Sequence, residues 1–80
     1  IQRIVLSKDS LPLKKINLTE REKECILWAA EGKTGWEIAN ILKLSERTVT
    51  FHLQNAASKM GVSGRQHAIS RALSMGLITP

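Results

Sequence analysis

The sequence predicts an all-α fold, a four-helix bundle, and three observations support this prediction. Ser or Thr is followed three residues later by Glu or Gln at three places, which is the capping-box pattern of a helix start. Glycines follow at distances that suit helix ends. The segments between these positions are amphipathic, and 42% hydrophobic residues in a chain of 80 are enough for one small core.

The expected helices lie between these start and stop positions. They cover residues 20–31, 35–42, 46–60 and 64–75. The capping boxes pair Thr19 with Glu22, Thr34 with Glu37, and Ser63 with Gln66. The glycines that suit left-handed C-cap positions are Gly32, Gly61 and Gly76. The sequence therefore defines the first, second and fourth helix starts by their capping boxes.

The third helix starts without a full capping box. Ser45 is the expected N-cap, and the residue three positions later is Thr48, a weaker partner than Glu or Gln. Leu44 and Val49 stand at the two positions of a hydrophobic staple, which fixes the direction in which a chain enters a helix. We expect this staple to compensate for the weaker cap.

The second and third helices are joined by the short segment 42–45, and Ala39 allows a close approach there. A connection this short forces a steep crossing, as in a helix-turn-helix. The turn has no glycine, so Lys43 must adopt whatever strained conformation the turn requires. A generic helical hairpin is the alternative on geometry alone.

The third helix has two stripes when its residues are spaced at about 100°. The stripe expected in the core is Val49, Leu53, Ala56 and Met60. The opposite stripe is Arg47, Phe51, Gln54 and Ser58, flanked by Thr50 and Asn55. An outward aromatic ring among hydrogen-bonding side chains suggests contact with another molecule. The alternative is that Phe51 covers a neighbouring element.

The charges are distributed unevenly along a chain of net charge +5. Residues 1–18 have net charge +3, residues 19–42 have −2, and residues 43–80 have +4. The positive field therefore lies over the third and fourth helices, which favours an anionic partner that approaches from one side. Basic domains without such a partner also exist, so charge alone does not identify it.

The cysteine and the apolar segments indicate the compartment. Cys25 has no second cysteine to pair with, and its neighbours Ile26 and Leu27 suggest a buried thiol in a reducing environment. The sequence has no apolar run of about 20 residues and no secretory pattern. We expect a cytoplasmic protein with no membrane partner.

Residues 1–17 show no sustained periodicity, and residues 18–80 form the expected helical domain. The stretch 4–6 could form a short strand or a docked extension, but Ser7 to Lys15 favours an interdomain linker. An ordered arm that packs on the bundle is the alternative, because Leu11, Leu13 and Ile16 are apolar. The chain begins at Ile1, so we expect a preceding domain that is absent here.

We predict no enzyme activity and no metal site. The sequence contains no set of nucleophile, base and orienting residue, and no glycine-rich phosphate loop. His52 lies at the edge of the core stripe, where a structural role is expected. His67 has no cysteine or carboxylate at ligand spacing.

The fourth helix has a wider apolar surface than a small bundle needs. Ile69 and Leu73 form one edge, and Ala68, Ala72 and Met75 form the other. We expect the first edge to face the core and the second to face a partner subunit. The alternative places all five residues in the core.

The segment Leu18 to Leu73 resembles a known family. Its sequence is LTEREKECILWAAEGKTGWEIANILKLSERTVTFHLQNAASKMGVSGRQHAISRAL, which matches the LTxRExEVL, EGxxxxEIA, SxxTVxxH, KxG and RxxA motifs of the LuxR-type helix-turn-helix domain. Within that family, the segments that contain Trp36 and Phe51 resemble the sequences of quorum-sensing receptors for acyl-homoserine lactones more than those of response regulators. The resemblance covers nearly all of the helical region.

The resemblance implies a C-terminal effector domain that binds double-stranded DNA of dyad symmetry as a homodimer. A separate N-terminal domain would bind an acyl-homoserine lactone, this chain itself would hold no cofactor, and RNA polymerase would be a further candidate partner. The protein would then act at the bacterial nucleoid. The recognition helix 46–60 would lie in the major groove.

The same resemblance assigns roles to single residues. The base-reading residues would be Thr50, Phe51, Gln54 and Asn55. Gln pairs with adenine N6 and N7, and a Phe ring or Thr methyl packs on the thymine methyl. The residues that position the DNA backbone would be Lys33, Thr34, Trp36, Arg47, Thr48 and Lys59. For Lys33 a solvated charge, and for Trp36 partial burial in the protein, are the alternatives.

Three other functions stay open at this point. A response-regulator output domain shares the family. Region four of sigma factors has a similar start, but the segment TVTFHL and the fourth helix after a glycine fit it poorly. A helical protein-interaction module would use the same outward face of the third helix on a protein groove, with weak salt dependence.

Overall fold

The computed structural model describes residues 16–79, in which all regular structure is helical. The four helices are α1 (Glu20–Ala30), α2 (Gly35–Leu42), α3 (Glu46–Lys59) and α4 (Arg65–Ser74). The predicted all-α fold is confirmed, and each predicted helix agrees within one residue at either end. The segment predicted as a linker, 1–17, lies outside the described residues except for its last two positions.

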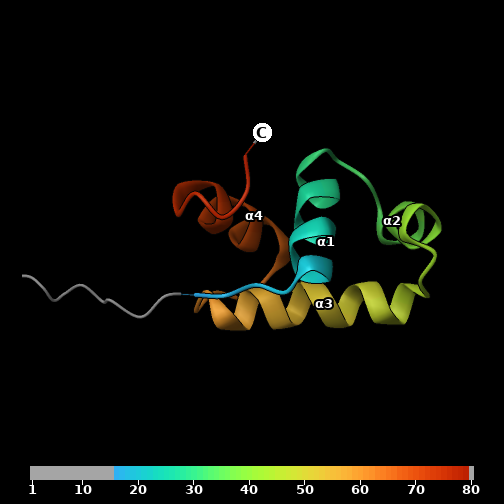
Figure 1. Ribbon diagram of the computed structural model, residues 1–80, viewed down its shortest axis with the longest axis horizontal. Helices are drawn as coiled ribbons and strands as arrows, with labels where there is room; N and C mark the ends of the chain where they lie inside the picture. Colours follow the sequence, from blue (N-terminus) through green and yellow to red (C-terminus); the bar gives the residue numbers. More distant parts are fainter. Residues whose placement is uncertain (1–15, 80) are drawn as a thin grey trace, which may run out of the picture.

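The long helix α3 forms one side of the domain (Figure 1). The other three helices all contact α3, and in Figure 1 they lie on the same side of it, with α2 near its start and α4 near its end. The opposite side of α3 faces away from the other three helices (Figure 1). This arrangement leaves one long helical face free.

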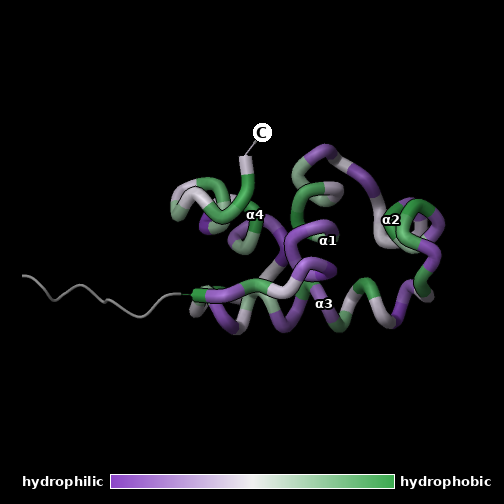
Figure 2. The backbone as a smooth tube through the Cα atoms, in the orientation of Figure 1, coloured by the Kyte–Doolittle hydropathy of each residue, from purple (hydrophilic) through white to green (hydrophobic). Residues whose placement is uncertain are grey.

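The core consists of two clusters that share Leu53 on α3. The first cluster lies between α1, α3 and α4 and contains Leu18, Ile26, Ala56, Ala57, Met60, Ala68, Ala72 and Ile78. The second cluster lies between α1, α2 and α3 and contains Cys25, Ala29, Ile38, Ala39 and Val49. The predicted core stripe of α3 is confirmed, with Val49, Ala56 and Met60 buried and Leu53 partly buried against both clusters. Figure 2 shows α3 alternating between hydrophobic and hydrophilic residues, as a half-buried helix requires.

Capping confirms three of the four predicted helix starts. In α1 the Thr19 hydroxyl accepts from the Glu22 amide at 3.1 Å, and the Glu22 carboxylate accepts from the Thr19 amide at 2.9 Å. Thr34 and Glu37 form the same reciprocal pair at the start of α2. At α3 the Ser45 hydroxyl accepts from the Thr48 amide, and the Thr48 hydroxyl bonds to the Ser45 hydroxyl rather than to the Ser45 amide, so the capping box is incomplete.

The predicted capping box of the fourth helix is wrong. The N-cap of α4 is Gly64 rather than Ser63, and the cap has no side-chain hydrogen bond. Gly64 has φ +90°, a conformation that glycine adopts readily and other residues avoid. Because this glycine starts the helix one residue later, Ser63 stands outside it and cannot serve as the cap.

The predicted edges of α4 are wrong in part: Ile69 packs against the second core cluster as predicted, but Ala68, Ala72 and Leu73 do not lie as expected. Ala68 and Ala72 are buried in the core of this chain, whereas Leu73 is 40% exposed. Small side chains at these two positions let α4 approach α1 and α3 closely, so they serve packing within the domain. They have no surface left for a partner subunit. Met75, by contrast, is 44% exposed just beyond the helix.

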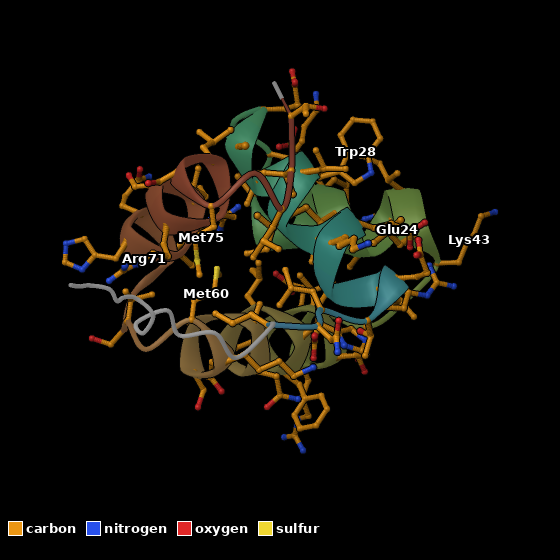
Figure 3. The ribbon with its side chains drawn as sticks, turned by 60° about the vertical axis from the view of Figure 1, so that its left-hand side comes forward. Glu24, Trp28, Lys43, Met60, Arg71 and Met75 are labelled. Carbon is orange, nitrogen blue, oxygen red and sulfur yellow. The ribbon has the colours of Figure 1, made fainter. Side chains whose placement is uncertain are left out.

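The turn between α2 and α3 has the strained residue that the sequence predicts. Lys43 has φ 62° and ψ 44°, the left-handed conformation, and closes α2 as its C-cap. The amide of Leu44 then donates to the Ala39 carbonyl at 2.9 Å. The Lys43 side chain projects away from the domain (Figure 3), so the strain is confined to the backbone.

Candidate nucleic-acid interface

The free face of α3 carries the side chains predicted to contact a partner. Arg47, Thr50, Gln54 and Ser58 are exposed on it, and Phe51 is 57% exposed. Asn55 is half-buried at the edge of the same face. The structure therefore brings the four predicted base-reading residues together on consecutive turns of one helix.

Phe51 does not cover a neighbouring element, so that alternative is wrong. Its ring instead lies next to the ring of His52, with the ring centroids 5.9 Å apart and the planes tilted by 59°. His52 is half-buried, as its place beside the core stripe predicts. The free face thus has one aromatic ring near its centre.

An open groove runs along one flank of the free face, with a volume of about 570 Å³. It lies between α3 and the start of α4. Its polar lining comes from Thr50, Gln54, Ser58, Ser63 and Arg65, and its apolar floor from Leu53, Ala57 and Val62. The hydroxyl and amide groups of α3 are therefore accessible from the side as well as from the front.

The part of the chain that follows Glu46 has only positive formal charges, which suits an anionic partner. After Glu46 the sequence contains no Asp or Glu as far as residue 80, whereas it contains Arg47, Lys59, Arg65 and Arg71. The other glutamates belong to α1, its C-cap and the first turn of α2. Figure 3 shows Arg71 on α4 projecting away from the core. The free face of α3 therefore carries no carboxylate beyond the first helical residue, Glu46.

The predicted backbone-contacting residues occupy several positions around this face. Arg47 and Trp36 are exposed, Trp36 to 63%. Partial burial, the alternative for Trp36, is therefore wrong. The Thr34 hydroxyl accepts from the Glu37 amide at 3.1 Å, and the Thr48 hydroxyl accepts from Ser45 at 2.9 Å. The Thr48 hydroxyl still has a proton to donate, whereas the Thr34 hydroxyl also bonds to the Glu37 carboxylate.

Two capping carboxylates have lowered pKa values. Burial acts to raise the pKa of Glu22, but hydrogen bonds from Lys59 and from the Thr19 amide outweigh it and lower this pKa below its usual value. The hydrogen bond from the Thr34 amide lowers the pKa of Glu37. Both carboxylates are therefore ionised at neutral pH.

Lys59 has a structural partner that the sequence does not reveal. Its Nζ atom donates to Oε1 of Glu22 at 2.8 Å and to the Asn17 carbonyl at 3.1 Å. The Glu22 side chain is only 4% exposed, so Lys59 neutralises a buried carboxylate. Lys59 is therefore engaged with α1, and its contact with the DNA backbone stays a prediction.

Arg65 is a second residue whose role the sequence did not indicate. It lines the groove beside α3, and its guanidinium donates to the carbonyl of Lys33 in the loop between α1 and α2. This contact ties the start of α4 to the loop that precedes the helix-turn-helix. The two residues are 32 positions apart, and no pattern in the sequence connects them.

The His, Cys, Asp and Glu side chains of residues 16–79 do not gather at one place. No group of three His, Cys, Asp or Glu side chains in this range could hold a metal ion. Cys25 is buried, and burial raises the pKa of its thiol, so it is a poor nucleophile. No helix in the same range is long and apolar enough to cross a membrane.

Comparison with known proteins gives a family match over most of the chain. Residues 16–72 match the model of the family described as bacterial regulatory proteins, luxR family. The chain is 55% identical over 62 residues to the transcriptional activator protein LuxR of Aliivibrio fischeri, a match that covers 78% of this chain and 25% of that protein. It is 51% identical over 73 residues to the transcriptional activator protein VanR of Vibrio anguillarum, covering 91% and 30%.

The fold of this chain is also similar to that of a solved structure. Escherichia coli SdiA is similar with a TM-score of 0.79 and 38% sequence identity, and the match covers 91% of this chain and 31% of the SdiA chain. The chain therefore spans less than a third of the length of these three relatives.

Proposed function

The chain belongs to the LuxR family of bacterial regulatory proteins, and from this premise we propose that it is the DNA-binding domain of a quorum-sensing transcriptional regulator. The free face of α3 carries this proposal. It presents hydroxyl, amide and aromatic groups, is backed along its whole length by the core, and has no carboxylate after Glu46. A helix about 10 to 12 Å in diameter fits the major groove of B-DNA.

The side chains at the centre of this face contact the DNA bases. Gln54 and Asn55 offer amides that pair with adenine, and the Thr50 hydroxyl can accept or donate a hydrogen bond. Arg47 at the start of α3 and Trp36 at the start of α2 flank this centre and contact the sugar-phosphate backbone. Lys33 adds a positive charge next to Thr34, and both residues contact the phosphates.

Two such domains act together as a homodimer on a site of dyad symmetry. Leu73 and Met75 leave exposed apolar surface at the end of α4, which supports this region as the contact between subunits. The two recognition helices would then contact DNA about 34 to 36 Å apart, one helical turn. RNA polymerase is a further partner of the bound dimer.

The whole protein has additional properties under this proposal. An N-terminal domain outside this chain binds an acyl-homoserine lactone, and the regulator acts at the nucleoid in the bacterial cytoplasm. The small share of the relatives' length that this chain spans supports a further domain in the whole protein. The domain itself binds DNA and catalyses no reaction.

Selection from random DNA tests the proposed function. The 80-residue chain is incubated with randomised duplexes at low and at physiological salt, and the bound fraction is sequenced. DNA binding predicts an enriched two-fold-symmetric sequence, with log affinity falling against log salt at a slope near −0.9 per neutralised phosphate. No enrichment together with a flat salt response would favour a protein-interaction module instead.

A further inference from the structure

We propose that Phe51 reads the 5-methyl group of a thymine in each half-site of the target DNA. This inference rests on the proposed function and makes it more specific. It assigns to one side chain of α3 one chemical group of the DNA, so the removal of a single methyl group from the DNA can test it.

The place of Phe51 in the fold supports the assignment. With about 100° per residue, Phe51 lies between Arg47 and Asn55 and opposite the buried residues Val49 and Met60. Its ring therefore points directly away from the core while its backbone belongs to the best-packed helix of the domain. A rigid support of this kind is what a specific contact requires.

The chemistry of the neighbouring side chains narrows what the ring can contact. Residues 48–58 of α3 contain no Lys or Arg, so the central turns have no cation to pair with guanine. Thr50, Gln54 and Ser58 present hydrogen-bonding groups, whereas Phe51 presents a ring that is 57% exposed. An apolar ring at this place requires an apolar partner.

The major groove offers one apolar group of this kind. Each base pair presents donors and acceptors there, and only thymine adds a methyl group. The tilted contact with His52 limits the positions of the Phe51 ring, with the centroids 5.9 Å apart. The absence of acidic residues beyond Glu46 lets the DNA approach this face without charge repulsion.

Uracil substitution tests the assignment, because uracil differs from thymine in major-groove chemistry by the methyl group alone. In the selected duplex, each thymine is replaced in turn by deoxyuridine, and affinity is measured by fluorescence anisotropy. We expect one position in each half-site where the change weakens binding about fourfold, the value for one buried methylene-sized group. Replacement in both half-sites should weaken binding about 15-fold.

Protein variants then identify the side chain responsible. Phe51→Ala should weaken binding to the thymine duplex and abolish the uracil effect at that position, whereas Phe51→Leu should keep it in part. Gln54→Ala is the matched control, since it should weaken binding but leave the uracil effect intact. Phe51 is exposed, so these variants should keep the urea unfolding midpoint of the parent chain.

Three results would overturn the inference. The parent chain could bind its selected site equally well with uracil at every position, or Phe51→Ala could retain the full uracil effect, which would assign the methyl contact to Thr50. Both results would leave the proposed function standing. Failure to select any duplex would instead reject the proposed function and the inference with it.

Discussion

Lys59 at the end of α3 and Glu22 in the first turn of α1 form an ion pair, with Nζ and Oε1 2.8 Å apart. The same carboxylate oxygen accepts from the Thr19 amide, and the same ammonium donates to the Asn17 carbonyl. The segment that leads into α1 is therefore fastened to the last turn of α3. This pair connects two helix ends that are 37 residues apart in the sequence.

Replacing Lys59 by Met should destabilise the domain. The change leaves a buried carboxylate without its cation, and a hydrogen bond to a charged group contributes about 1.5 to 3 kcal/mol. Because Lys59 is itself 38% exposed, water replaces part of this interaction, and we expect a loss of about 1 to 2 kcal/mol. Urea unfolding followed by circular dichroism measures it.

The exposed pair Arg21–Glu24 is the matched control for this prediction. Its charged atoms are 3.2 Å apart, and both side chains are more than 40% exposed. Arg21→Ala should therefore change stability by at most about 0.5 kcal/mol. Equal losses in Lys59→Met and Arg21→Ala would show that the contact with Glu22 has no special structural role.

Acid should destabilise the domain through Glu22. The folded state lowers the pKa of this carboxyl below its usual value of 4.5, because the hydrogen bonds from Lys59 and the Thr19 amide outweigh the effect of burial. A group with a lowered folded pKa contributes stability above its unfolded pKa and loses it as the pH falls through the folded pKa. The free energy of unfolding should therefore decrease below about pH 4.5.

Glu22→Gln removes the titrating group and tests this pH dependence. The variant keeps an oxygen that can accept from the Thr19 amide but loses the ion pair with Lys59, so its urea unfolding midpoint should be lower at pH 7. Between pH 6 and pH 3 this midpoint should change less with pH than in the parent chain. Lys59→Met should also reduce the slope, since Lys59 provides the largest effect that lowers this pKa. An unchanged slope in Glu22→Gln would place the acid sensitivity elsewhere.

Replacing Lys43 and replacing Gly61 should have opposite effects on stability, because both residues have a left-handed backbone conformation and only glycine adopts it without strain. Lys43 has φ 62° and Gly61 has φ 73°. The left-handed conformation costs a residue with a Cβ atom roughly 1 to 2 kcal/mol. Lys43→Gly should therefore stabilise the domain, by about 0.5 to 1 kcal/mol after the extra freedom of glycine in the unfolded chain is counted.

Gly61→Ala should destabilise the domain by about 1 kcal/mol. A Cβ atom at this position meets no atom within 4 Å, so the cost comes from the backbone conformation alone. Chemical denaturation of the two single variants and of their combination measures both effects. The prediction fails if Lys43→Gly lowers the unfolding midpoint.

The helices could be predicted from the sequence because their ends depend on local chemistry. The reciprocal bonds of Thr19 with Glu22 form within one turn, so a three-residue spacing is enough to predict them. The start of α4 could not be predicted in the same way, because Ser63 fits the pattern and Gly64 interrupts it through a backbone conformation. Helix periodicity likewise predicted the two faces of α3.

Contacts between distant segments limited the prediction of the site. The roles of Lys59 and Arg65 depend on which helix ends meet in the fold, and the sequence gives these positive charges without their partners. The two alanines of α4 show the same limit. Small residues permit close packing on either side of a helix, and only the three-dimensional arrangement shows that Ala68 and Ala72 face the core.

Base-reading and backbone-contacting residues should differ in how their loss depends on DNA sequence. Gln54→Ala removes a group that pairs with a base, so it should cost about 1 to 3 kcal/mol on the selected site and much less on random DNA. Arg47→Ala removes a charge at the start of α3, so it should weaken both complexes alike and reduce the salt slope by about 0.9 per half-site.

The control for these variants is Gln66→Ala, which removes the amide of an exposed glutamine on α4, away from the free face. Anisotropy titrations on both duplexes at several salt concentrations separate these effects, and equal losses on selected and random DNA for Gln54→Ala would refute its role in base reading.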